Sequence, residues 1–345
     1  ALYLKDVGFG HVRNIFGVAN LIRFQPQRSL IPEEHHLTTW IADRSIEFLR
    51  GNRDRPFFLW ASWFAPHAPF QVPDSFSQVL ADAPIPDPIR RLSSLPPKAQ
   101  AYSQHEDVIG DKQLRRSREL YHSHVSLIDK NIGRLLDELD ALALTEDTLV
   151  LFTSDHGCHF KTRNGEYKRS CHESSIRVPT AFTGPGFRGG GQLKELISLI
   201  DVPPTLLDAA GLEVPEHMQG QSLMPLVRDN DADWPEEVFV QISEAQVGRA
   251  VRTQRWKYGV DAPEAHGKGV AGADQYEEQY LYDLQADPYE LNNLIGLESH
   301  REVAQIMKER LLRRMKLAGE VPPSIIQAPE GRAGQRKVSI EEARS

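Results

Sequence analysis

The sequence predicts an α/β fold: a mostly parallel sheet flanked by helices, followed by a small antiparallel sheet with one helix. Apolar runs of strand length occur at residues 56–64 and 147–154, and a long amphipathic segment separates them. Strand, helix and strand in succession indicate a parallel sheet with a right-handed crossover. From residue 234 short β-like runs replace this pattern. We therefore expect an α/β domain over 1–230 and an α+β subdomain over 231–318.

Two segments have the spacing of helices. Five apolar residues of 32–52 fall near one helical face: Leu37, Trp40, Ile41, Phe48 and Leu49. Pro32 at the start of this segment and Gly51 at its end are typical helix boundaries. Residues 114–142 carry the most regular pattern, with apolar side chains three and four positions apart. We expect this second helix to pack on the sheet.

Polar residues follow the two apolar runs, where strands of the sheet would end. His67 follows the first run and Asp155 follows the second. Ligand sites of open α/β sheets collect at the carboxyl ends of their strands. Residues 71–112 are rich in Pro, Asp and Gln and show little periodicity, so we expect a surface loop that shapes a pocket.

The second half of the chain has shorter elements. The run "VPTAFTGPG" predicts a short strand stopped by its glycines, and Asp201 is expected to cap a helix that ends at Gly211. The runs "EVFVQIS", "GRAVRTQRWKYGV" and "QYLYDL", with a helix over 298–317, make up the predicted antiparallel subdomain. Residues 319–345 hold few apolar side chains, which predicts a mobile tail.

Composition narrows the class of protein. A chain of 345 residues with 40% hydrophobic content can bury a large core. Acidic residues outnumber basic ones by 48 to 40, so a nucleic-acid partner is not expected. No apolar run approaches the ~20 residues of a membrane span, and the first residues do not resemble a signal peptide. The chain lacks an initial Met, and we expect it to start inside a longer protein; the compartment and the oligomeric state stay open.

The stretch "TSDHGCHFKTRNGEYKRSCHESSIRVP", residues 153–179, concentrates polar chemistry after the second run. Ser154, Asp155 and His156 are neighbours whose side chains point in different directions, which argues against a serine relay. A carboxylate and an imidazole at a strand end suit a hard divalent cation, and Gly157 would let the backbone turn. The alternative is that Asp155 caps a turn and His156 is an ordinary loop histidine.

Two Cys-His pairs, Cys158 with His159 and Cys171 with His172, lie in the same stretch. Adjacent Cys and His lack the chelating spacing of zinc fingers, which weakens a zinc interpretation. A disulfide between the two cysteines in an exported protein, or two buried thiols, are the other interpretations, and all three stay open at this point.

A basic run joins the two pairs. Lys161, Arg163, Lys168 and Arg169 could hold an anionic group against a metal ion, although such runs are usually solvated loops. If His67 ends a neighbouring strand, then the metal, a lysine and a histidine could converge on one tetrahedral anion.

With these motifs the chain resembles the sulfatases, the formylglycine-dependent sulfuric ester hydrolases of the alkaline phosphatase superfamily. The motifs that carry the resemblance appear in the family's order: "PFFLWASWFAPHAPFQVP", "YHSHVSLIDKNIGRLLDELDAL", "SDHG" with a lysine thirteen positions after the Asp, "ESSIRVP", "RAVRTQRWKYGV" and "LYDLQADPYELNNL". They span about residues 30 to 300, which makes the match specific.

The resemblance implies roles for individual residues. Asp155 and His156 would ligate a divalent metal, usually Ca²⁺, while Lys168 and His67 would contact the sulfate or the leaving-group oxygen. His159, Arg163 and His172 would contribute to substrate binding. Glu173 and Arg177 look structural. The implied ligand is a sulfated small molecule or glycan, and a phosphodiesterase or phosphonate monoester hydrolase of the same superfamily is the nearest alternative.

One departure from the family is large. Sulfatases carry a Cys- or Ser-x-Pro-x-Arg motif whose first residue becomes formylglycine, and the sequence contains no such motif. We expect the formylglycine and the remaining metal ligands in an upstream segment, and we expect this chain alone to be inactive. A non-catalytic fragment that binds sulfated glycans is a further alternative.

Overall fold

The computed structural model describes residues 27–80, 83–87, 89, 111–160, 162–163, 167–229, 232–244, 246–265, 267, 269–331 and 338–344. Much of the predicted loop over 71–112, and Lys161, lie outside the described residues. Contacts divide the chain into a helical unit, Ala1–Pro88 with Val108–Thr148, and a sheet unit, Ile89–Asp107 with Leu149–Ser345. The boundary expected near residue 230 falls inside the sheet unit and stays a prediction about its internal organisation.

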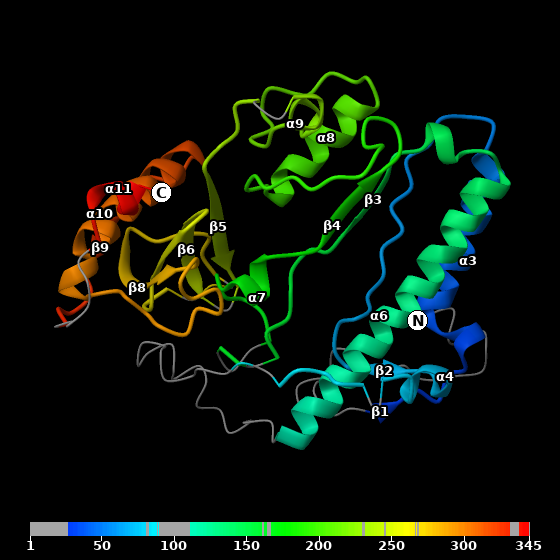
Figure 1. Cartoon of the computed structure of the whole chain (residues 1–345), viewed down its shortest axis with the longest axis horizontal. Helices are drawn as coiled ribbons and strands as arrows, with labels where there is room; N and C mark the ends of the chain where they lie inside the picture. Colours follow the sequence, from blue (N-terminus) through cyan, green and yellow to red (C-terminus); the bar gives the residue numbers. More distant parts are fainter. Residues whose placement is uncertain are drawn as a thin grey trace. The chain divides into compact units, whose positions relative to one another are not determined.

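Two long helices that run in the same direction dominate the helical unit. They are α3 (Leu37–Asn52) and α6 (Asp111–Ala141), which lie side by side in Figure 1. The short elements of this unit are β1 (Gln27–Arg28), η1 (Glu33–His35), β2 (Gln71–Val72), α4 (Asp74–Ser77) and η3 (Thr145–Asp147). Buried apolar side chains of α3 and α6 include Ala42, Ile46, Leu49, Leu120, Leu127 and Ile128. Both predicted helices are therefore confirmed. Of the five apolar residues expected on one face of α3, however, only Leu49 is buried, and the buried face also contains Ala42, Ile46 and small polar residues.

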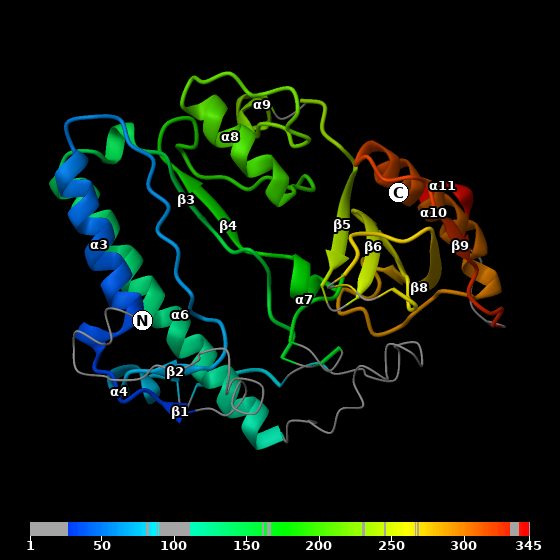
Figure 2. The same cartoon turned by 180° about the vertical axis from the view of Figure 1, so that it is seen from behind.

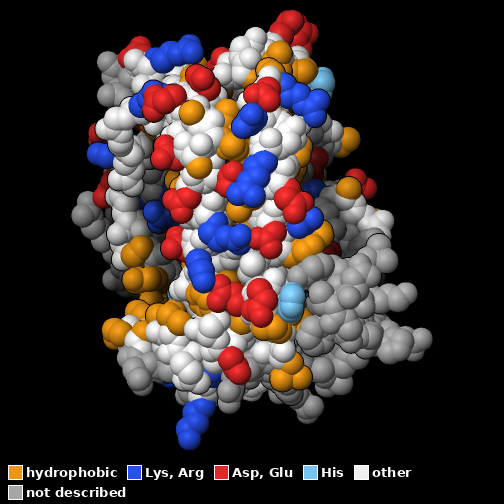
Figure 3. Space-filling model, turned by 90° about the vertical axis from the view of Figure 1, so that its right-hand side faces the viewer, with side chains coloured by type: hydrophobic (Ala, Val, Ile, Leu, Met, Phe, Trp, Pro, Cys, Tyr) orange, Lys and Arg blue, Asp and Glu red, His pale blue; other side chains and the backbone are white. Residues whose placement is uncertain are grey.

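Ion pairs lie on the outer face of these helices, where Figure 3 shows basic and acidic side chains interleaved. Arg50 donates two hydrogen bonds to Glu138, at 2.8 and 2.7 Å, and Arg134 pairs with Asp43 at 2.6 Å. Exposed pairs of this kind contribute little to stability, because water and salt screen them. The helical unit is therefore held mainly by its buried apolar face.

Residues 56–64, expected to be a buried strand, are extended but pair with no strand among the described residues. Their side chains alternate in exposure, and Phe58 and Trp60 are 71% and 80% exposed. The apolar pattern predicted the extended conformation, whereas a strand also requires a hydrogen-bonded neighbour.

The sheet unit begins with a two-stranded antiparallel sheet of β3 (Val150–Thr153) and β4 (Thr180–Thr183). Both strands were expected. The parallel pairing that we expected concerned the runs 56–64 and 147–154, and the antiparallel pairing of β3 with β4 was not predicted. Three helices and one helical turn belong to this part of the chain: α7 (Glu173–Ile176), η4 (Leu199–Asp201), α8 (Val202–Ala209) and α9 (Met224–Arg228). The Asp201 carboxylate accepts hydrogen bonds from the amides of Ser198 and Gln221, at 2.7 and 2.9 Å, which fixes the start of η4 and α8.

A five-stranded sheet forms the second part of this unit, as Figure 2 shows from behind. Its strands, in spatial order, are β5 (Glu237–Ser243), β6 (Val247–Thr253), β7 (Trp256–Asp261), β8 (Gln275–Asp283) and β9 (Ser324–Ile326). β5 to β8 are antiparallel, and α10 (Arg301–Leu317), which follows η5 (Glu298–His300), packs on them. The predicted antiparallel sheet with one helix is confirmed. Its core includes Val251, Trp256, Tyr258, Leu281, Met307 and Leu311.

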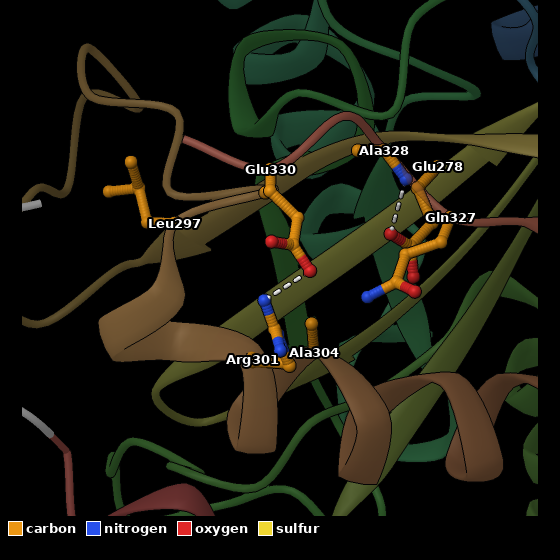
Figure 4. A pocket seen from close by; sticks show the side chains of 8 residues that line it. Glu278, Leu297, Arg301, Ala304, Gln327, Ala328 and Glu330 are labelled. Atoms are coloured by element: carbon orange, nitrogen blue, oxygen red, sulfur yellow. Dashed lines mark hydrogen bonds and ion pairs between the residues drawn. The ribbon is translucent and has the colours of Figure 1, made fainter. Parts of the chain in front are cut away.

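The tail that was expected to be mobile contributes to this sheet in its described residues. β9 pairs in parallel with β8, and α11 (Ile340–Arg344) contacts α10. Glu320 accepts from the buried guanidinium of Arg249 at 2.8 Å. Figure 4 shows Glu330 paired with Arg301, and the amide of Ala328 bonded to Glu278, around a cavity of about 10 Å³. Such a cavity has room for no more than one water molecule.

Glu237 joins β5 to α10 through three arginines. Its buried carboxylate accepts hydrogen bonds from Arg310, Arg313 and Arg314 at 2.7, 2.7 and 2.9 Å. Burial raises the pKa of Glu237, but the bonds from Arg313 and Arg310 outweigh it, and the net pKa lies below the usual 4.5. The carboxylate is therefore charged in the folded chain and stabilises it near neutral pH.

Replacing this carboxylate tests its contribution. Because a buried ion cluster loses about 3 to 5 kcal/mol when one partner is removed, we expect Glu237→Gln to lower the free energy of unfolding at pH 7 by about 3 kcal/mol. A depressed pKa contributes stability above the unfolded value, and this stability is lost as the pH falls through the folded value. The difference between wild type and variant should therefore shrink as the pH falls below about 4.5, measured by urea unfolding.

The exposed Glu309 on the same helix supplies the control, and Glu309→Gln should change stability by less than about 0.5 kcal/mol. If wild type and Glu237→Gln lost stability in parallel as the pH fell, the Glu237 cluster would not be the source of the acid sensitivity.

Candidate metal and sulfate site

Asp155 and His156 follow the end of β3. The Asp155 side chain is 83% exposed, and its Oδ1 accepts a hydrogen bond from the His156 amide at 2.9 Å. Its Oδ2 lies 3.4 Å from Nε2 of His156. The carboxylate and the imidazole edge therefore face the same small region at the strand end.

The hydrogen bonds of His156 indicate which ring nitrogen carries a proton. Nδ1 lies 2.8 Å from the carbonyl oxygen of Gly157, which can only accept, so Nδ1 is the donor. Nε2 lies 2.7 Å from Nζ of Lys168, which can only donate, so Nε2 presents its lone pair. A histidine that donates from Nδ1 to a carbonyl and offers Nε2 is in the form that binds a metal.

The donor set therefore fits a divalent cation in part. A carboxylate and an Nε2 lone pair are two ligands, and the Lys168 ammonium shows that this lone pair accepts a positive group. Among the described residues, no group of three or more His, Cys, Asp and Glu side chains could hold a metal by itself. Asp155 and His156 therefore stay predicted metal ligands.

Gly157 turns the chain away from this pair and packs directly against α7. Its amide donates to the carbonyl of Ser175 at 2.7 Å. A Cβ at this position would lie 2.2 Å from the carbonyl oxygen of Ser174, a distance that no side chain tolerates. Glycine is therefore required at this position because two backbones approach closely. It is not required by the backbone conformation, since Gly157 does not adopt a left-handed φ.

His159, Arg163 and His172 were predicted to bind substrate, and the structure buries all three. Nε2 of His159 bonds the carbonyl of Lys168 at 3.2 Å, and Nε2 of His172 bonds the Tyr282 hydroxyl at 3.2 Å. The guanidinium of Arg163 donates to the carbonyls of Tyr289 and Glu290. Burial lowers the pKa of His159 to about 4. In this structure the three side chains bind their own chain, and contact with substrate stays a prediction.

The two cysteines are free thiols in the structure. Burial raises the pKa of Cys158 to about 12 and that of Cys171 to about 11, so neither is a thiolate near neutral pH. Of the three interpretations left open by the sequence, the structure supports two free thiols, with Cys171 buried and Cys158 partly buried.

His67 lies in the helical unit, whereas Asp155, His156 and Lys168 lie in the sheet unit. Its ring is half-buried against Phe64, with centroids 4.5 Å apart, and Nδ1 is 2.5 Å from the carbonyl of Ala68. Its predicted contact with the sulfate or the leaving-group oxygen stays a prediction.

Sequence comparison finds two families that together match residues 4–317. The family "Sulfatase" matches residues 4–212, and the family "N-sulphoglucosamine sulphohydrolase, C-terminal" matches residues 165–317. An arylsulfatase of Clostridium perfringens is 30% identical over 82% of this chain and 59% of its own length. A choline-sulfatase of Rhizobium meliloti is 33% identical over 70% of this chain and 46% of its own length. The chain thus spans about half the length of the curated relatives it matches.

Solved structures support the fold class. The phosphonate monoester hydrolase SpPMH of Silicibacter pomeroyi superposes with a TM-score of 0.76 at 20% identity, over 91% of this chain and 68% of that one. BT4656, solved with its substrate D-glucosamine-2-N,6-O-disulfate, superposes with a TM-score of 0.68 at 22% identity, over 83% and 71%. The α/β alkaline phosphatase-like fold is therefore confirmed. None of the helices in the described residues combines the length and apolar character needed to cross a membrane.

The contact of Gly157 with α7 can be tested with one methyl group. We expect Gly157→Ala to lower the free energy of unfolding by about 2 kcal/mol, because the new Cβ meets backbone atoms that cannot rotate away. Gly133, in the middle of α6, has open space within 4 Å of the position that a methyl group would take, so Gly133→Ala should raise stability by up to about 1 kcal/mol. Urea unfolding of both variants measures this, and a Gly157→Ala protein as stable as wild type would contradict it.

Proposed function

This chain belongs to the sulfatase family, and from that premise we propose that the complete protein hydrolyses sulfate esters at a divalent metal held in part by Asp155 and His156. The observation that carries the proposal is the state of His156. Its Nδ1 is committed to the carbonyl of Gly157, while its Nε2 faces Lys168 beside the Asp155 carboxylate. Such a histidine is oriented to bind a cation, and a loop histidine without a role has no need of that arrangement.

The nature of the ligands favours a hard ion. Asp155 supplies a carboxylate oxygen and His156 an imidazole nitrogen, and the resemblance to sulfatases makes Ca²⁺ the first choice. When bound, the ion supplies positive charge that polarises a sulfate oxygen. The Gly157 carbonyl keeps the His156 ring in place, since it holds the Nδ1 proton.

Lys168 brings a second positive charge to the same region. Its Nζ lies 2.7 Å from Nε2 of His156 and over the ring of Tyr167 at 5.4 Å. An ammonium at this position can donate hydrogen bonds to an anionic sulfate oxygen. We assign Lys168 and His67 to the sulfate and to the leaving-group oxygen, with His67 as a proton donor to that oxygen.

The nucleophile is expected elsewhere. The 345 residues contain no Cys- or Ser-x-Pro-x-Arg sequence, so we place the formylglycine of the complete protein outside them. Without a nucleophile the metal and lysine can bind an anion but cannot cleave an ester. This polypeptide alone is therefore proposed to be inactive.

The proposed substrate class is a sulfated small molecule or glycan. Relatives named arylsulfatase and choline-sulfatase, and the neighbour solved with a disulfated glucosamine, support this choice. The superposition with a phosphonate monoester hydrolase keeps phosphate or phosphonate esters as the second candidate, because both reactions stabilise a metal-bound tetrahedral anion.

Metal binding can be measured directly. Calorimetric titration of the chain with CaCl₂ should show one site, and Asp155→Asn and His156→Ala should each weaken it at least about tenfold, a loss of about 1.4 kcal/mol. The matched control is Asp233→Asn, an exposed aspartate of the same unit, which should leave the affinity unchanged. Equal calcium affinity in Asp155→Asn and wild type would remove Asp155 from the metal site.

The absence of turnover is a separate prediction. With Ca²⁺ present, the 345-residue chain should release no sulfate from 4-nitrophenyl sulfate, and no phosphate from the matching phosphodiester. Turnover that Asp155→Asn abolishes would show that the nucleophile lies within this chain. Binding of a sulfated glycan that survives removal of calcium by EDTA would instead favour the non-catalytic alternative.

A further inference from the structure

Lys257 is a buried lysine in the central strand β7 of the five-stranded sheet. Its side chain is 0% exposed, and Nζ lies 2.6 Å from Oε1 of Glu173 and 2.6 Å from Oε1 of Glu290. An ammonium without water is costly unless it is paired and hydrogen-bonded. Lys257 therefore needs both carboxylates, which come from α7 and from the loop after β8.

Arg252 adds a second positive charge beside Lys257, so that two cations face the two carboxylates of Glu173 and Glu290. It lies on β6 opposite Lys257, and its Nε is 3.4 Å from Oε1 of Glu173. Burial raises the pKa of Glu173, but Lys257 and Arg252 outweigh it and the net pKa is lowered, so Glu173 is charged. Burial also raises the pKa of Glu290, and Lys257 opposes this rise. We call Glu173, Arg252, Lys257 and Glu290 the Lys257 cluster.

The cluster fixes α7 in place. Oε1 of Glu290 binds Lys257, and its Oε2 accepts the backbone amide of Glu173 at 2.9 Å. The first turn of α7 is therefore held by both its side chain and its main chain. Two residues further on, the carbonyl of Ser175 accepts the amide of Gly157 at 2.7 Å, and Gly157 directly follows the Asp155–His156 pair. The path from Lys257 to the metal ligands runs through a single short helix.

The segment that carries Lys168 is held by other hydrogen bonds, which reach the loop after β8 and the end of β5. Arg163 donates to the carbonyls of Tyr289 and Glu290. Arg169, next to Lys168, forms a two-bond pair with Glu244 at 2.7 and 2.6 Å. Both the Asp155–His156 pair and Lys168 thus rest on the five-stranded sheet, and Glu290 takes part in both supports.

From this geometry we infer that Lys257, Glu173 and Glu290 are positioning residues that hold Asp155 and His156 against Lys168. The inference rests on the proposed function, since it assigns these residues to the support of that site. The three act on the metal ligands through α7 and Gly157. A cluster with a purely structural role would stabilise the unit without affecting the site.

The decisive comparison uses two buried carboxylates of the sheet unit. Glu290→Gln removes a carboxylate from the Lys257 cluster, and Glu237→Gln removes one from the arginine cluster that joins β5 to α10. Both should lower the unfolding midpoint. Only Glu290→Gln should also weaken calcium binding, by about 10-fold to 100-fold, as outer-shell changes do in metal sites. Calcium affinity equal to wild type in a folded Glu290→Gln protein would overturn the inference.

Hydrogen exchange supplies a readout that needs no metal. In Glu290→Gln the amides of Gly157 and His159, bonded to Ser175 and Tyr167, should exchange at least about tenfold faster, while those of α10 stay unchanged. Glu237→Gln should leave Gly157 and His159 at wild-type rates. If Glu290→Gln fails to fold, Glu173→Gln replaces it, because Glu173 is less buried and the substitution keeps the shape of the side chain.

The two proposals fail differently in these measurements. A wild-type chain that binds no calcium, but shows faster exchange at Gly157 in Glu290→Gln, would refute the metal site and leave the positioning role intact. Normal calcium binding in wild type, with unchanged affinity and unchanged exchange in Glu290→Gln, would refute the positioning role alone.

Discussion

The burial of one ammonium group is the constraint on which the sheet unit depends. Lys257 sits in a central strand without solvent, so two carboxylates must reach it from segments that are distant in sequence. Glu173 brings α7 onto the sheet, and Glu290 fixes the loop after β8. With α7 and the loop after β8 fixed in this way, the backbone of Gly157 packs directly against the backbone of α7. This contact fixes the position of the Asp155–His156 pair, which immediately precedes Gly157.

Sequence patterns predicted the elements better than their pairing. The alternation in 237–284 and the spacing in 114–142 report which side of an element is buried, which is why the antiparallel sheet and α6 were predicted. Pairing depends on neighbours that no local pattern encodes. Hence β3 and β4 are antiparallel, 56–64 has no described partner, and β9 forms from a tail whose support is backbone bonds and the Arg249–Glu320 pair.

The sequence likewise identified some residues of the candidate site and missed others. Asp155 and His156 were identified from their place after a strand, and Lys168 from the resemblance to sulfatases. The structure does bring His156 and Lys168 together. Lys257 was not predicted to matter, because a lysine between aromatic residues normally extends its ammonium to water. The available signal was its position within a run whose neighbours, Trp256 and Tyr258, are both buried. A charged residue at the centre of such a run indicates a buried partner elsewhere in the chain.

Three polar side chains between Gly157 and His172 bond to their own chain. His159, Arg163 and His172 bond Lys168, Glu290 and Tyr282, and their contact with substrate stays a prediction. Within the described part of the chain, each keeps one buried polar atom without a hydrogen-bond partner, which weakens the fold locally.

Among the described residues, three of the four non-glycine residues with a left-handed φ lie between Gly157 and His172 or bond to that segment, and the fourth is Ala143. Phe160, Arg169 and Glu290 adopt left-handed φ angles of 49°, 61° and 54°. Such strain persists only where surrounding contacts enforce it, and functional sites are where it collects. Arg169, whose φ is left-handed, directly follows Lys168 and is held by its two bonds to Glu244, so the contacts that enforce this backbone angle also position Lys168 beside His156.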